Sequence, residues 1–166
     1  NAAEEQFRSG DYENAESNFK KILVVEPQNV YALCNLGVIQ LRQSRNDEAS
    51  VTLKKALAYD YNSERGHYLL GVAQLRQGNH EEAATEIREG LKLNPRNSAA
   101  HYVLGFLSNM NGDRSAAIRE FEQSINIDSG NSAAYHALAV LYFKSGRMED
   151  SRRSYNLAVK NGAPRD

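Results

Sequence analysis

The chain has 166 residues and a mass of 18.5 kDa, and its 41% hydrophobic and 25% charged residues are typical of a soluble globular protein. Twenty basic residues against 21 acidic ones give a formal net charge of −1, so no overall field favours nucleic acid or an anionic membrane. The single cysteine, Cys34, excludes an internal disulfide and a cysteine-based metal cluster. No apolar stretch approaches the roughly 20 residues of a membrane-spanning helix. We expect a soluble protein without membrane insertion, and the cytoplasm is the favoured compartment.

A motif begins in the first 29 residues and then recurs four times along the chain. A shift of 34 residues aligns the sequence with itself without an insertion. The alignment gives a partial unit, residues 1–29, and four full units, residues 30–63, 64–97, 98–131 and 132–165. We therefore expect a single domain over residues 1–166.

Three sets of positions recur within the unit. A leucine followed by a very small residue indicates a close approach of two helices in the first half, at Leu36-Gly37, Leu70-Gly71, Leu104-Gly105 and Leu138-Ala139. A mid-unit turn is predicted at Gly10, Gly78, Gly112 and Gly146, with Ser44 as the exception. In the second half, a small residue precedes a large one by four positions, at Ala15/Phe19, Ala49/Leu53, Ala83/Ile87, Ala117/Phe121 and Ser151/Tyr155.

These positions predict two antiparallel helices in each unit. Apolar residues recur at steps of three and four residues on both sides of the turn, which is typical of amphipathic helices. Acidic residues gather where the second helices begin, where the positive end of a helix stabilises them, at Glu13, Asp47, Glu48, Glu81, Glu82, Glu149 and Asp150. Asn97 and Asn131 are expected to cap the N-terminal ends of two first helices.

The recurring positions resemble the tetratricopeptide repeat (TPR) family, whose pattern combines Leu-Gly, Ala-x-x-x-Phe and a closing Pro at a 34-residue period. Pro27 and Pro95 occupy the closing position, whereas Tyr61, Ser129 and Ala163 replace it in the other units. The resemblance covers the entire chain. It implies an all-α fold, a right-handed α-solenoid of stacked antiparallel helix pairs known as the TPR superhelix.

No segment carries a catalytic or cofactor-binding motif. His67 and His101 share one repeat position, but Leu33 and Tyr135 occupy the same position in other units, which indicates packing. We expect no Asp or Glu near either histidine to orient its ring. The sequence therefore predicts that the chain is not an enzyme and holds no cofactor or metal.

In the family that the chain resembles, the first helices line a concave groove that binds peptides. Carried over position by position, the resemblance implies a peptide-binding groove lined by Asn35, Val38, Arg42, Arg65, Tyr68, Val72, Arg76, Tyr102, Phe106, Asn109, His136, Val140, Phe143 and Lys144. Valine and phenylalanine recur in one column of this set, although a helix face that meets only water is ordinarily polar. An apolar groove with a basic rim is therefore expected.

The sequence thus predicts a protein–protein interaction scaffold that binds a peptide segment or helix of a partner, an apolar one with acidic residues. The basic residues have an alternative role at the C-terminal ends of the first helices, where cations are favourable. Two other functions stay open. The chain is either an assembly module that self-associates, as a homo-oligomer, through open terminal repeats, or the TPR arm of a larger enzyme that recruits its substrate.

Overall fold

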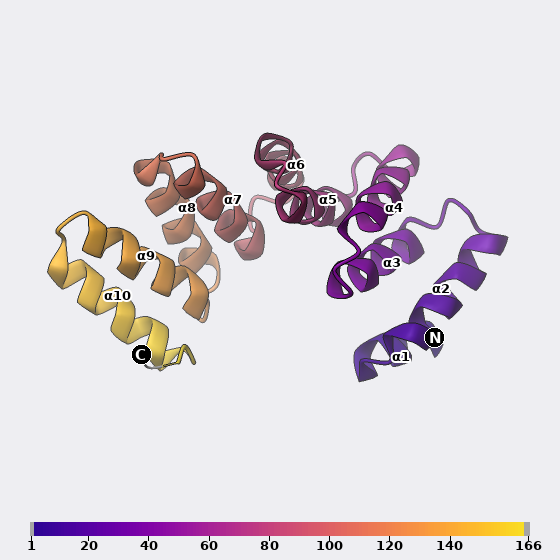
Figure 1. Cartoon of the computed structure of the whole chain (residues 1–166), viewed down its shortest axis with the longest axis horizontal. Helices are drawn as coiled ribbons and strands as arrows, with labels where there is room; N and C mark the ends of the chain where they lie inside the picture. Colours follow the sequence, from indigo (N-terminus) through magenta and orange to yellow (C-terminus); the bar gives the residue numbers. More distant parts are fainter. Residues whose placement is uncertain (1, 165–166) are drawn as a thin grey trace. The chain divides into compact units, whose positions relative to one another are not determined.

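The computed structural model describes residues 2–164, and these contain ten α-helices and no strand (Figure 1). The prediction of an all-α fold is confirmed. Each helix packs antiparallel to its partner within a repeat, and within each unit described below the pairs stack in sequence order as in a TPR solenoid. The helices are α1 (Ala2–Ser9), α2 (Tyr12–Val25), α3 (Val30–Arg42), α4 (Asn46–Tyr59), α5 (Glu64–Gln77), α6 (His80–Leu93), α7 (Ser98–Met110), α8 (Arg114–Ile127), α9 (Ser132–Lys144) and α10 (Met148–Lys160).

The helices form two compact units. Unit 1 contains α1 to α6 and ends at Leu93, and unit 2 contains α7 to α10 and begins at Asn94. In unit 1, α3 packs on α2, and α5 packs on both α3 and α4, while in unit 2 α9 packs on α8. The first helix of one pair therefore covers the apolar side of the pair before it. That residues 1–166 behave as a single domain stays a prediction.

Glycine lets the two helices of a pair approach closely. A Cβ added to Gly71 would lie 2.7 Å from Cγ1 of Ile87, and one added to Gly105 would lie 2.8 Å from Cδ1 of Phe121. Neither distance is compatible with a side chain, because the packed interior leaves no room for one more carbon. Ile87 and Phe121 are themselves buried at the crossing. The close approach predicted from the repeat is confirmed.

Caps and turns set where the helices begin and end. The first helix of each full unit is preceded by a polar side chain that accepts a hydrogen bond of 2.9–3.1 Å from the backbone N–H three residues later, at Asn29, Ser63, Asn97 and Asn131. Gly78 and Gly146 adopt left-handed backbone angles after the first helix, with φ of 83° and 74°. Ser44 adopts the same conformation with φ of 59°, so the turn survives there without glycine.

The two histidines that share a repeat position each connect the helices of a pair. Nδ1 of His67 lies 2.7 Å from Oε2 of Glu86, and its Nε2 lies 2.8 Å from the carbonyl oxygen of Tyr61. The expectation that no acidic residue lies near these histidines is wrong. Glu86 is 19 residues away, on the second helix, so no local spacing reveals it.

His101 repeats this arrangement in unit 2. Its Nδ1 lies 2.7 Å from Oε2 of Glu120, and its Nε2 lies 3.1 Å from the carbonyl oxygen of Pro95. Both ring nitrogens of each histidine therefore have a partner within the chain, which makes this a packing position that also satisfies hydrogen bonds.

Replacement of Gly71 by Ala is expected to destabilise the fold by roughly 1–3 kcal/mol, because the added carbon overlaps Ile87 at the helix crossing. The measurement is the free energy of unfolding in urea. Helix propensity alone would act in the opposite direction, since alanine is favoured over glycine in a helix interior by about 1 kcal/mol. An increase in stability would therefore contradict the close-approach argument.

Replacement of Glu86 by Ala is expected to lower the free energy of unfolding by roughly 1–3 kcal/mol, because it leaves a buried ring nitrogen of His67 without its partner. The matched control is Glu89→Ala on the same helix, whose carboxylate pairs with the exposed side chain of Lys92 at 2.6 Å. Loss of this surface pair is expected to cost much less, because water and salt screen it. Equal losses in the two variants would show that the histidine contact adds no stability.

Candidate functional site

The first helices of unit 1 present half-buried apolar residues. Val38, Tyr68 and Val72 are partly buried, because each packs against the core cluster formed by α3, α4 and α5. Burial raises the pKa of the Tyr68 phenol. Each of these three predicted groove residues therefore contacts the core with part of its side chain and exposes the rest to solvent.

Predicted basic residues of unit 1 are held in place by contacts within the unit. Nη2 of Arg65 donates to Oδ1 of Asn35 at 2.8 Å, and its guanidinium lies 5.8 Å from the ring centroid of Tyr31. Asn35 is only 4% exposed, and its Nδ2 also donates to the carbonyl oxygen of Tyr31. Asn35 thus orients Arg65 from beneath the surface.

Two further arginines lie at the ends of first helices. Nη1 of Arg76 donates to the carbonyl oxygen of Leu41 in the last turn of α3, which agrees with a role at helix C-terminal ends. The guanidinium of Arg42 lies 5.8 Å from the ring centroid of Tyr12. Both arginines remain exposed, so their charge still acts at the surface.

Unit 2 exposes larger apolar side chains. Phe106 is 42% exposed, Val140 39% and Phe143 62%. Tyr102 is partly buried, with its ring centroid 5.6 Å from that of Phe121. The other predicted groove residues of this unit, Asn109, His136 and Lys144, are exposed. Three predicted groove residues on α7 and α9 are therefore large apolar side chains that face solvent.

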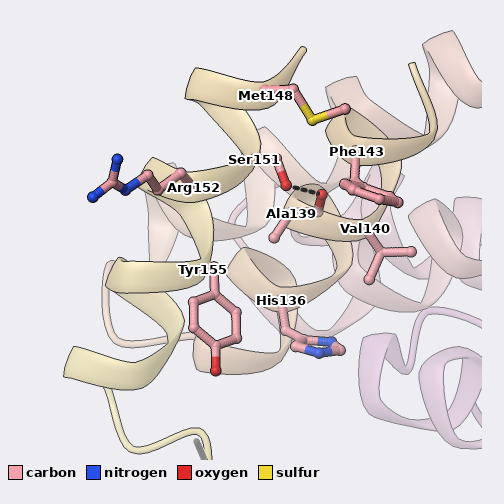
Figure 2. Close-up of a pocket in the computed structure, with 8 residues that line it drawn as sticks. All are labelled: His136, Ala139, Val140, Phe143, Met148, Ser151, Arg152 and Tyr155. Carbon is pink, nitrogen blue, oxygen red and sulfur yellow. Dashed lines mark hydrogen bonds between the residues drawn. The ribbon is translucent and has the colours of Figure 1, made fainter. Parts of the chain in front are cut away.

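An apolar hollow of about 410 Å³ lies between α9 and α10 (Figure 2). Figure 2 shows Met148 and Phe143 towards one end and Tyr155 and His136 towards the other, with Arg152 directed outward from α10. The full lining is His136, Ala139, Val140 and Phe143 from α9, with Met148, Ser151, Arg152 and Tyr155 from α10.

One polar group in the lining of this hollow forms a hydrogen bond between its two helices. Oγ of Ser151 donates to the carbonyl oxygen of Ala139 at 2.8 Å, which ties the two helices together (Figure 2). The remaining wall is formed largely by carbon and sulfur atoms of Val140, Phe143 and Met148. Such a surface suits an apolar group of a ligand, whereas a charged group could interact only at the edge of the hollow.

The hollow brings together three predicted groove residues, His136, Val140 and Phe143, and adds five that the sequence interpretation missed. One of the missed residues, Ala139, belongs to α9, and the other four belong to the second helix, namely Met148, Ser151, Arg152 and Tyr155. Two of them, Ser151 and Tyr155, are the small and the large residue of the pair that recurs in the second half of each unit. The sequence therefore indicated a packing role for them and no role in binding.

Within residues 2–164, no group of three or more His, Cys, Asp or Glu side chains could hold a metal ion. Burial raises the pKa of the Cys34 thiol, which disfavours the reactive thiolate. Among the helices described, none has the length and apolar character to cross a membrane.

Comparison with known proteins agrees with this architecture. Tetratricopeptide repeat models match residues 6–73, 108–164 and 68–131. The crystal structure of MamA shares 25% identity over 97% of this chain and 94% of that chain, with a TM-score of 0.83. No match was found among curated protein sequences.

Other solved structures share the fold. Pseudomonas aeruginosa PilF has 23% identity over 99% of this chain and 75% of that chain, with a TM-score of 0.91. A thermophilic TPR protein of Thermus thermophilus has 23% identity over 97% of this chain and 88% of that chain, with a TM-score of 0.79. Proteins built from these repeats generally act as protein-interaction scaffolds and not as enzymes. With family models matching most of its length, the chain belongs to the tetratricopeptide repeat family.

Proposed function

We propose that the chain is a scaffold that binds an apolar segment of a partner protein against the exposed faces of its first helices. The observation that carries this proposal is the exposure of Phe106, Val140 and Phe143 on the first helices of unit 2. Each Å² of apolar surface that a partner covers contributes about 25 cal/mol to the free energy of association before its costs. Aromatic side chains in such a place are the usual anchors of a protein interface.

Basic residues on the same set of helices favour acidic residues in the bound segment. Arg42 and Arg76 are exposed in unit 1, and Lys144 is exposed in unit 2. Hydrogen bonds within the chain already restrict the side chains of Arg65 and Arg76. These side chains therefore lose less conformational entropy when a carboxylate binds to them. Charges at the edge of an apolar surface accelerate association and select partners of opposite sign.

Self-association through the last helix pair is a second candidate function. The hollow between α9 and α10 supports it, because an exposed apolar surface can be covered by a second copy. Sedimentation velocity over a range of protein concentrations separates the two functions, since only self-association makes the mass depend on concentration.

Replacement of Phe106 by Ala is expected to weaken binding of the partner segment by about 2 kcal/mol or more, because it removes an aromatic anchor. Segments are selected from a displayed peptide library on the full chain, and their affinities are measured by calorimetry. The control is Val51→Ala, because Val51 is 70% exposed but lies on α4, a second helix. The proposal fails if the selected segments bind the Phe106 variant as tightly as the Val51 variant.

Replacement of Arg42 by Glu is expected to slow association with an acidic segment and to flatten the salt dependence of the rate, with a smaller change in the dissociation rate. Stopped-flow measurements at several salt concentrations check this. An unaltered association rate would show that the basic residues do not select the partner.

A further inference from the structure

A buried histidine of unit 1 lies between two hydrogen-bond acceptors. His67 on α5 is 1% exposed. Its ring nitrogens lie 2.7 Å from a carboxylate oxygen of Glu86 and 2.8 Å from the carbonyl oxygen of Tyr61. A backbone carbonyl has no proton to donate, and an ionised carboxylate has none either. Both ring nitrogens of His67 must therefore donate if both contacts are hydrogen bonds.

A neutral imidazole cannot form these two hydrogen bonds, because one of its nitrogens is a donor and the other is an acceptor. The acceptor nitrogen would face the lone pairs of an oxygen at hydrogen-bond distance, in a place that water does not reach. An imidazolium ion carries a proton on each nitrogen and satisfies both oxygens. A glutamic acid releases its proton more readily than an imidazolium ion does, so the additional proton belongs to the ring and not to Glu86.

The same arrangement recurs in unit 2. Nδ1 of His101 lies 2.7 Å from Oε2 of Glu120, and its Nε2 lies 3.1 Å from the carbonyl oxygen of Pro95. Glu120 stands at the repeat position of Glu86, and Pro95 stands at that of Tyr61. Two separate helix pairs therefore bring the same three groups together.

Among the four full units, the histidine and the glutamate are either both present or both absent. The unit with Leu33 at the histidine position has Thr52 at the glutamate position. The unit with Tyr135 at the histidine position has Ser154 at the glutamate position. A packing role of the ring alone would not require a carboxylate on the facing helix. The joint occurrence therefore indicates that the two side chains act as a pair.

We propose that His67 and His101 are imidazolium ions in the folded chain at neutral pH, and that the α5/α6 and α7/α8 pairs are therefore held together by a proton. Each ring then forms one ion pair and one charge-assisted hydrogen bond to a carbonyl oxygen. Two such bonds offset the cost of placing a charge away from water. The proposal goes beyond the scaffold function, since it concerns how pH controls the stability of the helices that present the binding surface.

The direction of the pH dependence follows from the number of bound protons. A histidine in an unfolded chain loses its second ring proton at about pH 6.5, whereas the folded pairs retain it above that pH. The folded state then binds more protons than the unfolded state, so the free energy of unfolding falls as the pH rises above about 6.5. Acidification towards that pH strengthens the two helix pairs, and alkaline conditions weaken them.

The charged groups placed against the two rings are carboxylates. Glu86 faces His67 from α6, and the ring of Tyr61 lies edge-on to it at a centroid distance of 5.0 Å. Glu64 lies one turn before His67 on α5. Glu120 faces His101 from α8. A neighbouring negative charge favours the charged form of an imidazole.

The protonation state is tested by nuclear magnetic resonance on the full chain with isotope-labelled histidine. The measurement is made at about pH 7.5, where a free histidine is mostly neutral. Both ring nitrogens of His67 and of His101 should carry a proton. The exposed rings of His80 and His136 should each have one nitrogen without a proton. A ring nitrogen without a proton in His67 or His101 overturns the proposal.

The effect on stability is tested by urea unfolding at about pH 6 and about pH 8, a range in which histidine is the side chain that ordinarily titrates. The double variant Glu86→Gln/Glu120→Gln places an amide beside each ring. This amide can donate to a neutral ring nitrogen, so both hydrogen bonds persist without the additional proton. Between the two pH values, the unfolding constant of the unaltered chain should rise at least about tenfold more than that of the double variant.

A matched control replaces an exposed histidine. His136→Gln should keep the pH dependence of the unaltered chain, because its ring lies at the surface. Equal pH dependence in the unaltered chain and in the double glutamine variant would overturn the proposal. The resonance measurement needs no substitution, so it decides the proposal even if a variant does not fold.

Discussion

Three helix pairs, α3/α4, α5/α6 and α7/α8, close tightly because the first helix carries glycine where it crosses the second. Ile87 fills the space in front of Gly71, and Phe121 does so in front of Gly105. The same close crossing brings His67 within hydrogen-bond distance of Glu86, so polar satisfaction follows from apolar packing. The stack depends on it as well, since a wider pair would not present a continuous apolar face to the next helix.

The repeat positions predicted the fold, the turns and the caps because these depend on residues that are close in sequence and recur. Whether a neighbouring helix buries a residue does not follow from its repeat position alone. Leu41 and Phe143 stand at one repeat position, yet the first is 4% and the second 62% exposed. Leu41 shares its core cluster with Leu69 and Leu70 of α5, a contact that its repeat position alone does not reveal. The sequence could not reveal Glu86 beside His67 for a related reason, since the two residues lie on different helices.

The candidate binding surface consists of the first-helix side chains that stacking does not bury, and these side chains differ in kind between the two units. In unit 1 the apolar residues Val38 and Val72 are partly buried against the core. The exposed side chains of its first helices include arginines, and one of them is fixed by a hydrogen bond within the unit. In unit 2 the apolar side chains Phe106 and Phe143 stand out further. Unit 1 is therefore suited to contribute charge to an interface, and unit 2 is suited to contribute apolar area.

Within the described residues, the substantial helix contacts of each unit join members of the same pair or of neighbouring pairs. Such a stack behaves as a row of coupled elements, in which each responds mainly to the next. A ligand seated on α9 and α10 would suppress fraying of that pair and pass part of the effect to α7 and α8 through the interface between α8 and α9. The protection of backbone amides from hydrogen exchange would then decrease from α9 and α10 towards α7 and α8. The strength of the interface between α8 and α9 would determine how much of the ligand's stabilising effect reaches α7 and α8.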